Sequence, residues 1–310
     1  MTGPRFTAAA RCALLVGLCS AMVVPARAQE AGTPRLISTD ELAAWIGRER
    51  VAVIDVRQSW TAYLQSHLPD ASWLHVESLR AAEGGLPFQL FSGAQYAALF
   101  SRLGLAPTMP VVVYSAGDQA DIDATFAVWL LVTAGARDVR LLDGGFAKWQ
   151  LEGRPVTQRS PRAAAGAGGG FDPGTFRPAV ASLQDVIRAV EGSGALLVDA
   201  RPPEQYQGTA GAQARRGHIP GALNHPWKDD LEKPEFSLVW KSPAQLRHDY
   251  AAAGITPDRD IILYCNSGTE ASHVYFALRY LLGYPRVWIY AGSWTQWAER
   301  EELPVETGGR

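Results

Sequence analysis

Most of this 310-residue chain repeats itself once, and the repeat limits which folds the chain can adopt. Each half contains an apolar run that ends in Asp and Arg, a His-x-Pro turn, a second apolar run, and a glycine turn followed by Trp. The paired landmarks stand between 144 and 151 residues apart and are Asp55/Asp199, His67/His218, Ser115/Cys265 and Trp149/Trp297. So little drift over so many landmarks predicts two duplicated domains with minor insertions.

Within each half, short apolar runs alternate with amphipathic segments at residues 38–48, 94–103, 182–190 and 243–253. This alternation is typical of an α/β domain with a mainly parallel sheet and helices on both faces. We expect one such domain over residues 35–156 and another over residues 179–306. Residues 157–178 lie between them, and the Ala/Gly run at 163–170 cannot hold a core, so we predict a flexible linker there.

The first 28 residues have the pattern of a secretory signal peptide. Arg5 and Arg11 precede an apolar stretch at residues 12–24, and a small-residue A-x-A pattern ends at Ala28. The apolar stretch is too short and wrongly flanked for a stable membrane span. We therefore predict cleavage after Ala28 and an exported protein, periplasmic if the source is a Gram-negative bacterium.

The export prediction changes how the three cysteines are interpreted. Cys12 and Cys19 leave with the signal, so the mature chain retains Cys265 alone and cannot form an internal disulfide. Cys19 could indicate a lipoprotein, but the preceding Leu18 is bulky where that cleavage site needs a small residue. A lone thiol is a liability in an oxidising compartment unless its reactivity is used, although an intermolecular disulfide is an alternative.

Cys265 stands between a four-residue apolar run at 261–264 and a helix-like segment from His273 to Leu282, with Gly283 after it. A strand that turns through a short polar loop into a helix points backbone N–H groups inward, and the helix dipole adds positive potential. We expect this environment to lower the pKa of the thiol below its free value of about 8.5. Cys265 is therefore a candidate nucleophile, and a buried structural thiol is the alternative.

The first half has Ser115 where the second half has Cys265. A serine hydroxyl without an adjacent base is a poor nucleophile, and serine cannot hold a persulfide. We expect the first domain to be structural, with the alternative that it lends residues to a cleft. The chain carries 29 basic and 31 acidic residues without a basic run, so we expect no nucleic-acid partner.

Four segments of the second half resemble the tandem-domain rhodanese family, which includes the thiosulfate and 3-mercaptopyruvate sulfurtransferases. They are residues 199–201, 216–222, the cysteine loop and residues 292–294. The resemblance implies two rhodanese-like domains and a sulfurtransferase without a metal or organic cofactor. The Cys265 thiolate would take a sulfane sulfur from a small-molecule donor, hold it as a persulfide and pass it to cyanide or a thiol. The loop residues that would stabilise the persulfide are Asn266, Ser267, Gly268, Thr269, Glu270 and Ala271.

Two other functions can be served by a cysteine in such a loop. A cysteine phosphatase of this fold needs an arginine six positions after the cysteine to clamp phosphate. That position is Ala271 here, which argues against a phosphatase. The second alternative is a non-catalytic sulfur carrier that hands its persulfide to a protein acceptor. Either function requires only one cysteine that can hold a persulfide, so both the enzyme and the carrier fit this sequence.

The sulfur donor is suggested by the loop and by one position outside it. Ser267 matches the serine of the mercaptopyruvate type, two positions after the cysteine. Both types place a substrate-binding arginine four residues after the matched Arg201, and this chain has Gln205 there. Segments 272–273 and 281–284 look more like bacterial thiosulfate-type proteins. We expect thiosulfate as the donor, with 3-mercaptopyruvate as the alternative.

The supporting candidates are charged residues before the loop. Asp199 and Arg201 recur in the first half as Asp55 and Arg57, which favours a buried pair that braces the loop over a substrate contact. Arg215 and Arg216 either supply positive charge to the site or form a solvated surface pair.

Other aromatic and histidine residues are interpreted as structural. His218 recurs as His67 in the half without a cysteine, which favours a hydrogen-bonded turn residue over a general base. Trp294 and Trp297 follow a glycine turn, and we expect both to pack in the core. His273 fits either a surface or a cleft position.

Overall fold

The computed structural model describes residues 32–47, 51–83, 86–118, 122–161, 170–192, 194–233 and 236–309. The predicted signal peptide, with Cys12 and Cys19, lies outside these residues and stays a prediction. Among the described residues, no helix combines the length and apolar character needed to cross a bilayer.

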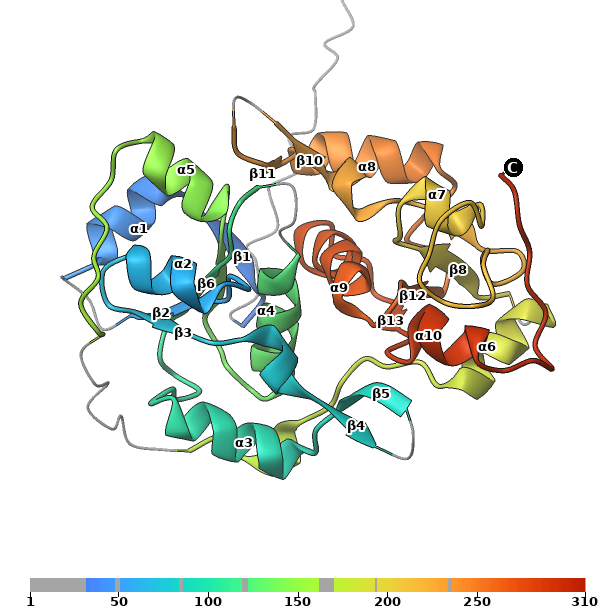
Figure 1. Ribbon diagram of the computed structural model, residues 1–310, viewed down its shortest axis with the longest axis horizontal. Coiled ribbons are helices and arrows are strands. Elements are labelled where there is room, and N and C mark those ends of the chain that lie inside the picture. The colour runs from blue at the N-terminus through green and yellow to red at the C-terminus, as the bar shows by residue number, and fades with distance from the viewer. Residues whose placement is uncertain are drawn as a thin grey trace, which may run out of the picture. The chain divides into compact units, whose positions relative to one another are not determined.

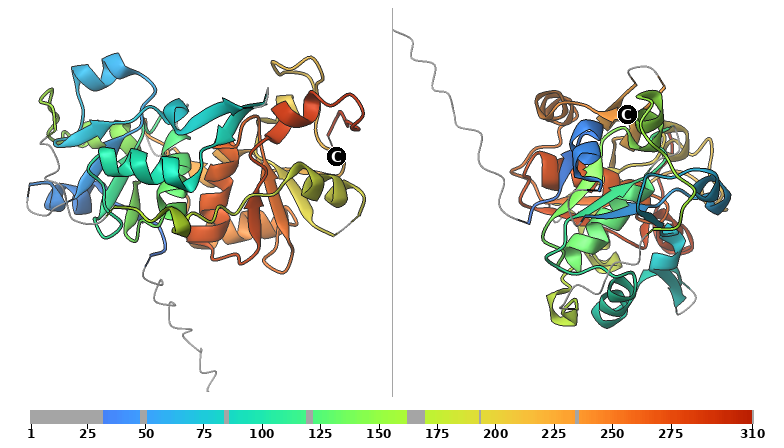
Figure 2. Two further views of the ribbon diagram at one scale, coloured as in Figure 1. Left: turned by 90° about the horizontal axis from the view of Figure 1, so that it is seen from below. Right: turned by 90° about the vertical axis from the view of Figure 1, so that its left-hand side faces the viewer.

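The first half forms a five-stranded parallel sheet with the strand order β1-β7-β6-β2-β3 (Figure 1). Its strands are β1 (Arg35–Ile37), β2 (Ala52–Asp55), β3 (Ala71–Trp73), β6 (Val111–Tyr114) and β7 (Val139–Leu142). Its helices are α1 (Thr39–Trp45), α2 (Trp60–Gln65), α3 (Gly93–Arg102), α4 (Asp123–Thr133) and α5 (Gly145–Leu151). After β3, the 3₁₀ helix η1 (Val76–Leu79) leads into an antiparallel ribbon of β4 (Arg80–Glu83) and β5 (Leu86–Leu90), which lies beside the second half (Figures 1 and 2).

The second half repeats the arrangement as a parallel sheet with the order β13-β12-β8-β9. Its strands are β8 (Leu196–Asp199), β9 (Leu223–Asn224), β12 (Ile261–Tyr264) and β13 (Val287–Ile289), and β10 (Leu231–Glu232) pairs separately with β11 (Val239–Trp240). Its helices are α6 (Leu183–Val190), α7 (Pro203–Tyr206), η3 (Trp227–Asp230), α8 (Pro243–Ala252), α9 (Thr269–Tyr275), η4 (Phe276–Leu281) and α10 (Ser293–Ala298). The counterpart of β1 is reduced to one bridge between Val180 and Ile289.

Local sequence signals explain where several helices begin. The side chains of Ser38, Ser92 and Ser182 each accept a hydrogen bond from the backbone N–H three residues later. The side chain of that later residue accepts a hydrogen bond from the backbone N–H of the serine. These capping boxes satisfy N–H groups that the helix itself leaves unpaired. The predicted α/β class and the four predicted helices are confirmed, whereas the exact domain bounds stay a prediction.

The apolar core connects the two halves. Alternate residues of β2 and β6 pack on opposite faces of the first sheet: Val53 and Tyr114 on one, Ile54 and Val113 on the other. The cluster that contains Ile54 continues into the second half. At the junction α4, which is buried from Asp123 to Leu131, packs beside α9 (Figure 1), and the hydroxyl oxygens of Thr125 and Ser272 lie 3.2 Å apart.

The end of the predicted linker packs against the first half. Phe171 is buried, and its ring centroid lies 5.6 Å from that of Phe100 on α3. The following 3₁₀ turn, η2 (Pro173–Thr175), approaches Gly93 so closely that a Cβ there would stand 2.5 Å from the Pro173 carbonyl oxygen. Residues 162–169, where the Ala/Gly run predicts flexibility, lie outside the described residues.

Candidate active site

Cys265 lies directly after β12, at the carboxyl end of the second sheet. Its side chain is buried, with 1 % of the residue exposed. The backbone N–H of Gly268 donates a hydrogen bond to the Cys265 Sγ over 3.1 Å. Gly268 has φ +90°, which a residue with a side chain rarely adopts, so glycine allows the chain to fold back over the sulfur.

The turn that follows β13 holds the cysteine backbone from the other side. The Cys265 N–H donates to the Ser293 Oγ over 3.2 Å, and the Cys265 carbonyl accepts from the Trp294 N–H over 2.8 Å. The Ser293 hydroxyl donates in turn to the Tyr290 carbonyl over 2.7 Å. Ser293 has φ +51°, a strained conformation for a residue other than glycine. Both backbone polar groups of Cys265 are therefore fixed.

The predicted lowering of the Cys265 pKa is wrong for this resting structure. Burial of the thiol and the nearby Glu270 carboxylate raise its pKa to about 11, against the opposing effect of the backbone N–H groups of Ala271, Ser267 and Gly268. Burial disfavours the thiolate because the low-dielectric surroundings solvate charge poorly. The Gly268 N–H donates to the sulfur, but the backbone amides do not outweigh desolvation and the like charge.

Glu270 has a raised pKa of its own. Burial together with the Asp199 carboxylate raises the pKa of Glu270 to about 7, and Arg201 partly offsets this. A carboxyl group with this pKa exchanges a proton near neutral pH.

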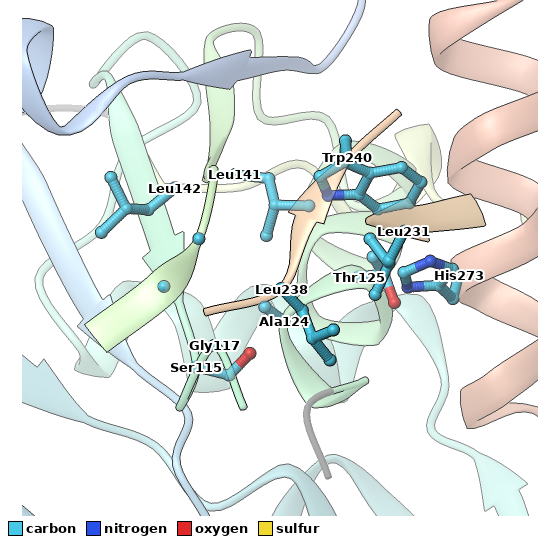
Figure 3. Close-up of a pocket in the computed structure, with 12 residues that line it drawn as sticks. Ser115, Gly117, Ala124, Thr125, Leu141, Leu142, Leu231, Leu238, Trp240 and His273 are labelled. Carbon is cyan, nitrogen blue, oxygen red and sulfur yellow. The ribbon is translucent and has the colours of Figure 1, made fainter. Parts of the chain in front are cut away.

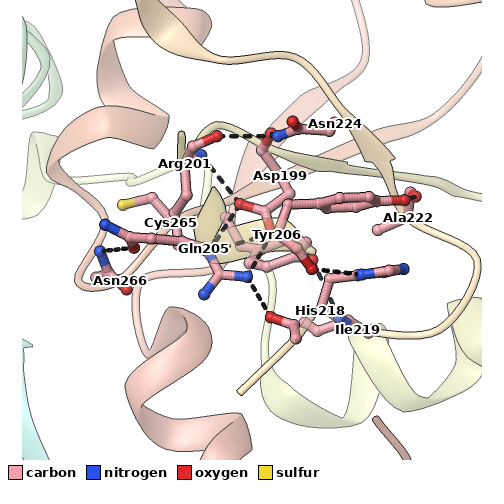
Figure 4. Close-up of polar contacts among 12 residues, drawn as sticks. Asp199, Arg201, Gln205, Tyr206, His218, Ile219, Ala222, Asn224, Cys265 and Asn266 are labelled. Carbon is pink, nitrogen blue, oxygen red and sulfur yellow. Dashed lines mark hydrogen bonds and ion pairs between the residues drawn. The ribbon is translucent and has the colours of Figure 1, made fainter. Parts of the chain in front are cut away.

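Gln205 contacts the loop next to the cysteine. The Asn266 Nδ2 donates to the Gln205 Oε1 over 2.9 Å, as Figure 4 shows. The Asn266 Oδ1 is buried and has no hydrogen-bond partner within the described residues. The resemblance implies an arginine at position 205. This chain has the uncharged Gln205 there, and its side chain binds the loop residue Asn266.

Asp199 and Arg201 form a buried brace below the loop (Figure 4). The Arg201 Nε and Nη2 donate to the two carboxylate oxygens of Asp199 over 2.9 and 2.6 Å, and Nη2 also donates to the Gly217 carbonyl over 2.8 Å. The first half repeats the brace, with Arg57 Nη2 donating to Asp55 over 2.7 Å. Because the copy without a cysteine keeps the pair, the geometry favours the structural interpretation over a substrate contact.

The first of the two candidate arginines after this brace, Arg215, binds the C-terminal segment and not the cysteine loop. The Arg215 Nη1 and Nη2 donate to the backbone carbonyls of Arg300 and Leu303 over 2.5 and 2.6 Å. Arg216 is exposed. Arg215 therefore braces the C-terminal segment.

An arginine of the first half reaches the loop, and no sequence motif indicates this contact. The Arg80 Nη1, at the start of β4, donates to the Ser267 carbonyl over 2.8 Å, while Nη2 bonds to Glu77. The Arg80 guanidinium also lies 4.9 Å from the ring centroid of Phe126 on α4. The contact joins residues 187 positions apart, so no local pattern could have indicated it.

The other predicted residues occupy structural positions. The His218 Nδ1 lies 2.8 Å from the Tyr206 carbonyl oxygen, which confirms the hydrogen-bonded turn interpretation. Trp294 and Trp297 are buried in the core as predicted. In the described part of the chain, no group of three or more His, Cys, Asp or Glu side chains is placed to hold a metal ion.

The Ser115 side of the junction holds a separate small cavity, with a volume of about 30 Å³ (Figure 3). Ser115, Thr125 and Trp240 contribute to its lining, together with His273, which is buried and stacked on Trp240 at a centroid distance of 4.2 Å. This volume suits about one water molecule. Thr269 and Ala271 are buried at the start of α9, on the cysteine side.

Comparison with known proteins follows the same division into halves. The family model described as a rhodanese-like domain matches residues 38–152 and again residues 182–300. The chain is similar to a sulfur carrier protein, TtuD, of Thermus thermophilus, with 35 % identity over 88 % of this chain and 96 % of that protein.

Two further relatives carry enzyme names. A thiosulfate sulfurtransferase of Corynebacterium glutamicum is 31 % identical over 92 % of this chain and 94 % of its own length. A 3-mercaptopyruvate sulfurtransferase of Escherichia coli is 31 % identical over 88 % and 98 %. A solved anaerobic ergothioneine biosynthesis enzyme from Chlorobium limicola shares the fold, with a TM-score of 0.74 and 21 % identity over 89 % of this chain and 71 % of that one.

Proposed function

Because this chain belongs to the rhodanese family, we propose that it is a sulfurtransferase in which Cys265 carries sulfur from a small-molecule donor to a thiophilic acceptor. The observation that carries the proposal is the Gly268 N–H, which donates to the Cys265 Sγ over 3.1 Å. The backbone N–H groups of Ala271 and Ser267 also act to lower the pKa of this thiol. Amides held in place for a negative sulfur stabilise a thiolate and a persulfide without reorganising.

The proposed reaction has two displacement steps. The Cys265 thiolate attacks the outer sulfur of thiosulfate, sulfite leaves with the electron pair of the broken S–S bond, and the cysteine becomes a persulfide. Cyanide or a thiolate then attacks the terminal sulfur, and the Cys265 thiolate leaves. Ser115 occupies the matching place in the first half and cannot form this intermediate.

Thiosulfate is the proposed donor, with 3-mercaptopyruvate as the alternative. Relatives with the thiosulfate name match the chain at 29 to 34 % identity and those with the 3-mercaptopyruvate name at 31 %, so identity favours neither donor. The neutral Gln205 at the position of the family arginine means that an anionic donor is bound largely by backbone amides. Arg80, which contacts the loop through the Ser267 carbonyl, adds positive potential from the first half.

A sulfur carrier is the second candidate, and the similarity to the Thermus thermophilus protein favours it specifically. In that case the persulfide would form on Cys265 but pass only to a protein acceptor. The chemistry of loading is the same, so the two functions differ only in whether small acceptors discharge the persulfide.

Two measurements separate these functions. Intact mass after treatment with each donor should show one added sulfur on the wild type and none on Cys265→Ser. Steady-state turnover with donor and cyanide should follow, and it should disappear in Cys265→Ser. Stoichiometric loading without turnover would favour the carrier, and no adduct with either donor would contradict both.

A further inference from the structure

We propose that the second half holds a binding site for a small, uncharged aromatic molecule of about the size of indole, separate from the cysteine loop. The site is a cavity of about 400 Å³ beside α6. This volume lies within the range in which proteins bind small molecules. The cavity would give the protein a second ligand besides the reactants of sulfur transfer.

The cavity lies at the opposite end of the sheet from Cys265. Ala195 and Asp260 line it, and they stand directly before β8 and β12, at the amino ends of these strands. Cys265 follows the carboxyl end of β12. A molecule bound in the cavity therefore does not occupy the place of a sulfur donor.

Much of the cavity lining is apolar, and one side of it is aromatic. The apolar lining residues are Val180, Ala181, Ala195, Ile262 and Trp288. The Trp288 side chain, on β13, is half-buried and packs partly on the core of the second half. Its ring offers a flat surface on which another ring can stack, which adds to the gain from removing apolar surface from water.

The first half shows how the chain itself fills the equivalent place. There the Trp45 ring of α1 covers Arg140 of β7, with the guanidinium carbon 3.7 Å from the ring centroid. The matching helices α1 and α6 begin at the capping boxes of Ser38 and Ser182. Counting from these caps, the position of Trp45 in α1 is held by Ala189 in α6. The second half therefore lacks the covering indole.

The strand pairing identifies the residue that this indole would cover. In the first half Val112 of β6 pairs in register with Arg140, and in the second half Ile262 of β12 pairs with Trp288. Trp288 thus stands where Arg140 stands. A ring stacked on Trp288 would occupy the place that the Trp45 ring occupies in the first half.

The second half has alanine at three positions where the first half has a larger apolar side chain. The pairs are Ile37/Ala181, Trp45/Ala189 and Val51/Ala195, all 144 residues apart like Asp55 and Asp199. Two of these alanines line the cavity. The cavity is therefore explained by the side-chain volume that the second copy lacks.

The charged groups at the rim favour an uncharged ligand. Asp185 and Arg188 of α6 form one ion pair, and the Arg286 Nε lies 2.7 Å from the Asp260 carboxylate in another. Because each carboxylate already faces a guanidinium, the rim offers no unbalanced charge to an anion or a cation.

The test titrates indole into the full chain and follows the indole N–H signals of its 10 tryptophans by NMR. The Trp288 signal is identified by its loss in Trp288→Phe. It should shift with added indole and reach a plateau, because the ligand ring stacks on it. A Trp288 signal that indole does not move would overturn the proposal.

Filling the cavity provides the matched comparison. Ala189→Trp restores the side chain of the first half and should weaken indole binding about tenfold, or 1.4 kcal/mol, because its ring takes the place of the ligand. Ala252→Trp adds the same ring at an exposed position of α8 and should bind indole as the wild type does.

A second variant keeps the test decisive if Ala189→Trp folds poorly. The double variant Ala181→Ile/Ala195→Val narrows the cavity with the other side chains of the first half and should also weaken indole binding. Wild-type affinity in a folded variant with a filled cavity would overturn the proposal.

Charged analogues test the class of ligand. Tryptamine and indole-3-acetate carry the same ring with a cationic or an anionic tail, and both should bind no more tightly than indole. Tighter binding of either one, weakened by added salt, would assign the cavity to a charged ligand and overturn the uncharged class. No sulfur donor takes part in these titrations, so they succeed or fail separately from the proposed sulfur transfer.

Discussion

Arg80, in the half without a cysteine, donates a 2.8 Å hydrogen bond to the backbone carbonyl of Ser267 in the cysteine loop. The guanidinium is held on its other side by Glu77 and by the ring of Phe126. The backbone N–H of Ser267 also acts to lower the pKa of the Cys265 thiol. The first half therefore helps to fix the loop that follows Cys265.

Replacing Arg80 should weaken sulfur transfer. We expect Arg80→Met to lower kcat/KM about tenfold, because a hydrogen bond to a charged group is worth about 1.5–3 kcal/mol. Arg80→Lys keeps the charge and should retain part of the activity. Arg140→Met removes another buried arginine of the same half, which pairs with Asp138, and should leave kcat/KM unchanged at temperatures below unfolding. Equal losses in the two methionine variants would show that the effect is only structural.

Gln205 should control how strongly the site binds an anionic donor. Gln205→Arg places a guanidinium beside Asn266 and should lower the KM for thiosulfate about tenfold, an effect that weakens as salt screens the charge. Steady-state kinetics at two ionic strengths measure it. Gln207→Arg, exposed two residues later, is the matched control. An unchanged KM in Gln205→Arg would mean that the donor does not approach this side of the loop.

The two buried braces should contribute similar stability. Asp55→Asn and Asp199→Asn each leave a buried arginine without its carboxylate, and we expect each to lower the free energy of unfolding by about 3–5 kcal/mol. Urea denaturation monitored by tryptophan fluorescence gives both values. If Asp199→Asn lost activity without losing stability, Arg201 would have to be assigned to substrate binding instead.

His273 should make the fold sensitive to acid. Burial and the nearby His225 lower its pKa from 6.5 to about 3. Between these two values the unfolded chain binds a proton that the folded chain does not, so stability rises with pH across this window. From pH 7.5 to 5 this residue should cost about 2 kcal/mol of stability, at 1.36 kcal/mol per pKa unit.

The matched test replaces His273 by Phe, since neither ring nitrogen has a hydrogen-bond partner among the described residues. His273→Phe should show a smaller difference in unfolding free energy between pH 7.5 and 5 than the wild type. His248→Gln, at an exposed position, should keep the wild-type difference. Parallel pH dependence in His273→Phe and the wild type would assign the acid sensitivity to other groups.

We also propose that the chain is exported and cleaved after Ala28. Expression of the full precursor in a Gram-negative host should yield a periplasmic protein that begins at Gln29, as measured by intact mass. Retention of residues 1–28, or attachment of lipid at Cys19, would contradict the proposal.

The duplicated landmarks were enough to predict the fold. Strand and helix periods are local signals, so the sequence places Cys265 between β12 and α9 without reference to the rest of the molecule. The same repeat predicts the Asp–Arg braces. The carboxyl ends of parallel strands meet at one edge of the sheet, and Asp199 pairs in register with Tyr264, the residue before Cys265.

What escaped prediction depends on distant parts of the chain. The raised pKa of Cys265 follows from burial and from the nearby Glu270 carboxylate, and a loop sequence does not specify how deeply the thiol is buried. The Gln205–Asn266 contact joins residues 61 positions apart, and Arg80 reaches Ser267 from the other half. Propensity and periodicity carry no information on such pairings.

The apolar core passes from the first half through α4 and α9 into the second, and this affects which substitutions the protein can tolerate. If each half had its own core, destabilising substitutions in the copy without a cysteine would not affect the other copy. With a shared core, a cavity opened beside Phe126 removes support from the helix that follows Cys265. The copy without a cysteine is therefore part of the mutational target of the copy that carries Cys265, which gives selection a reason to maintain both.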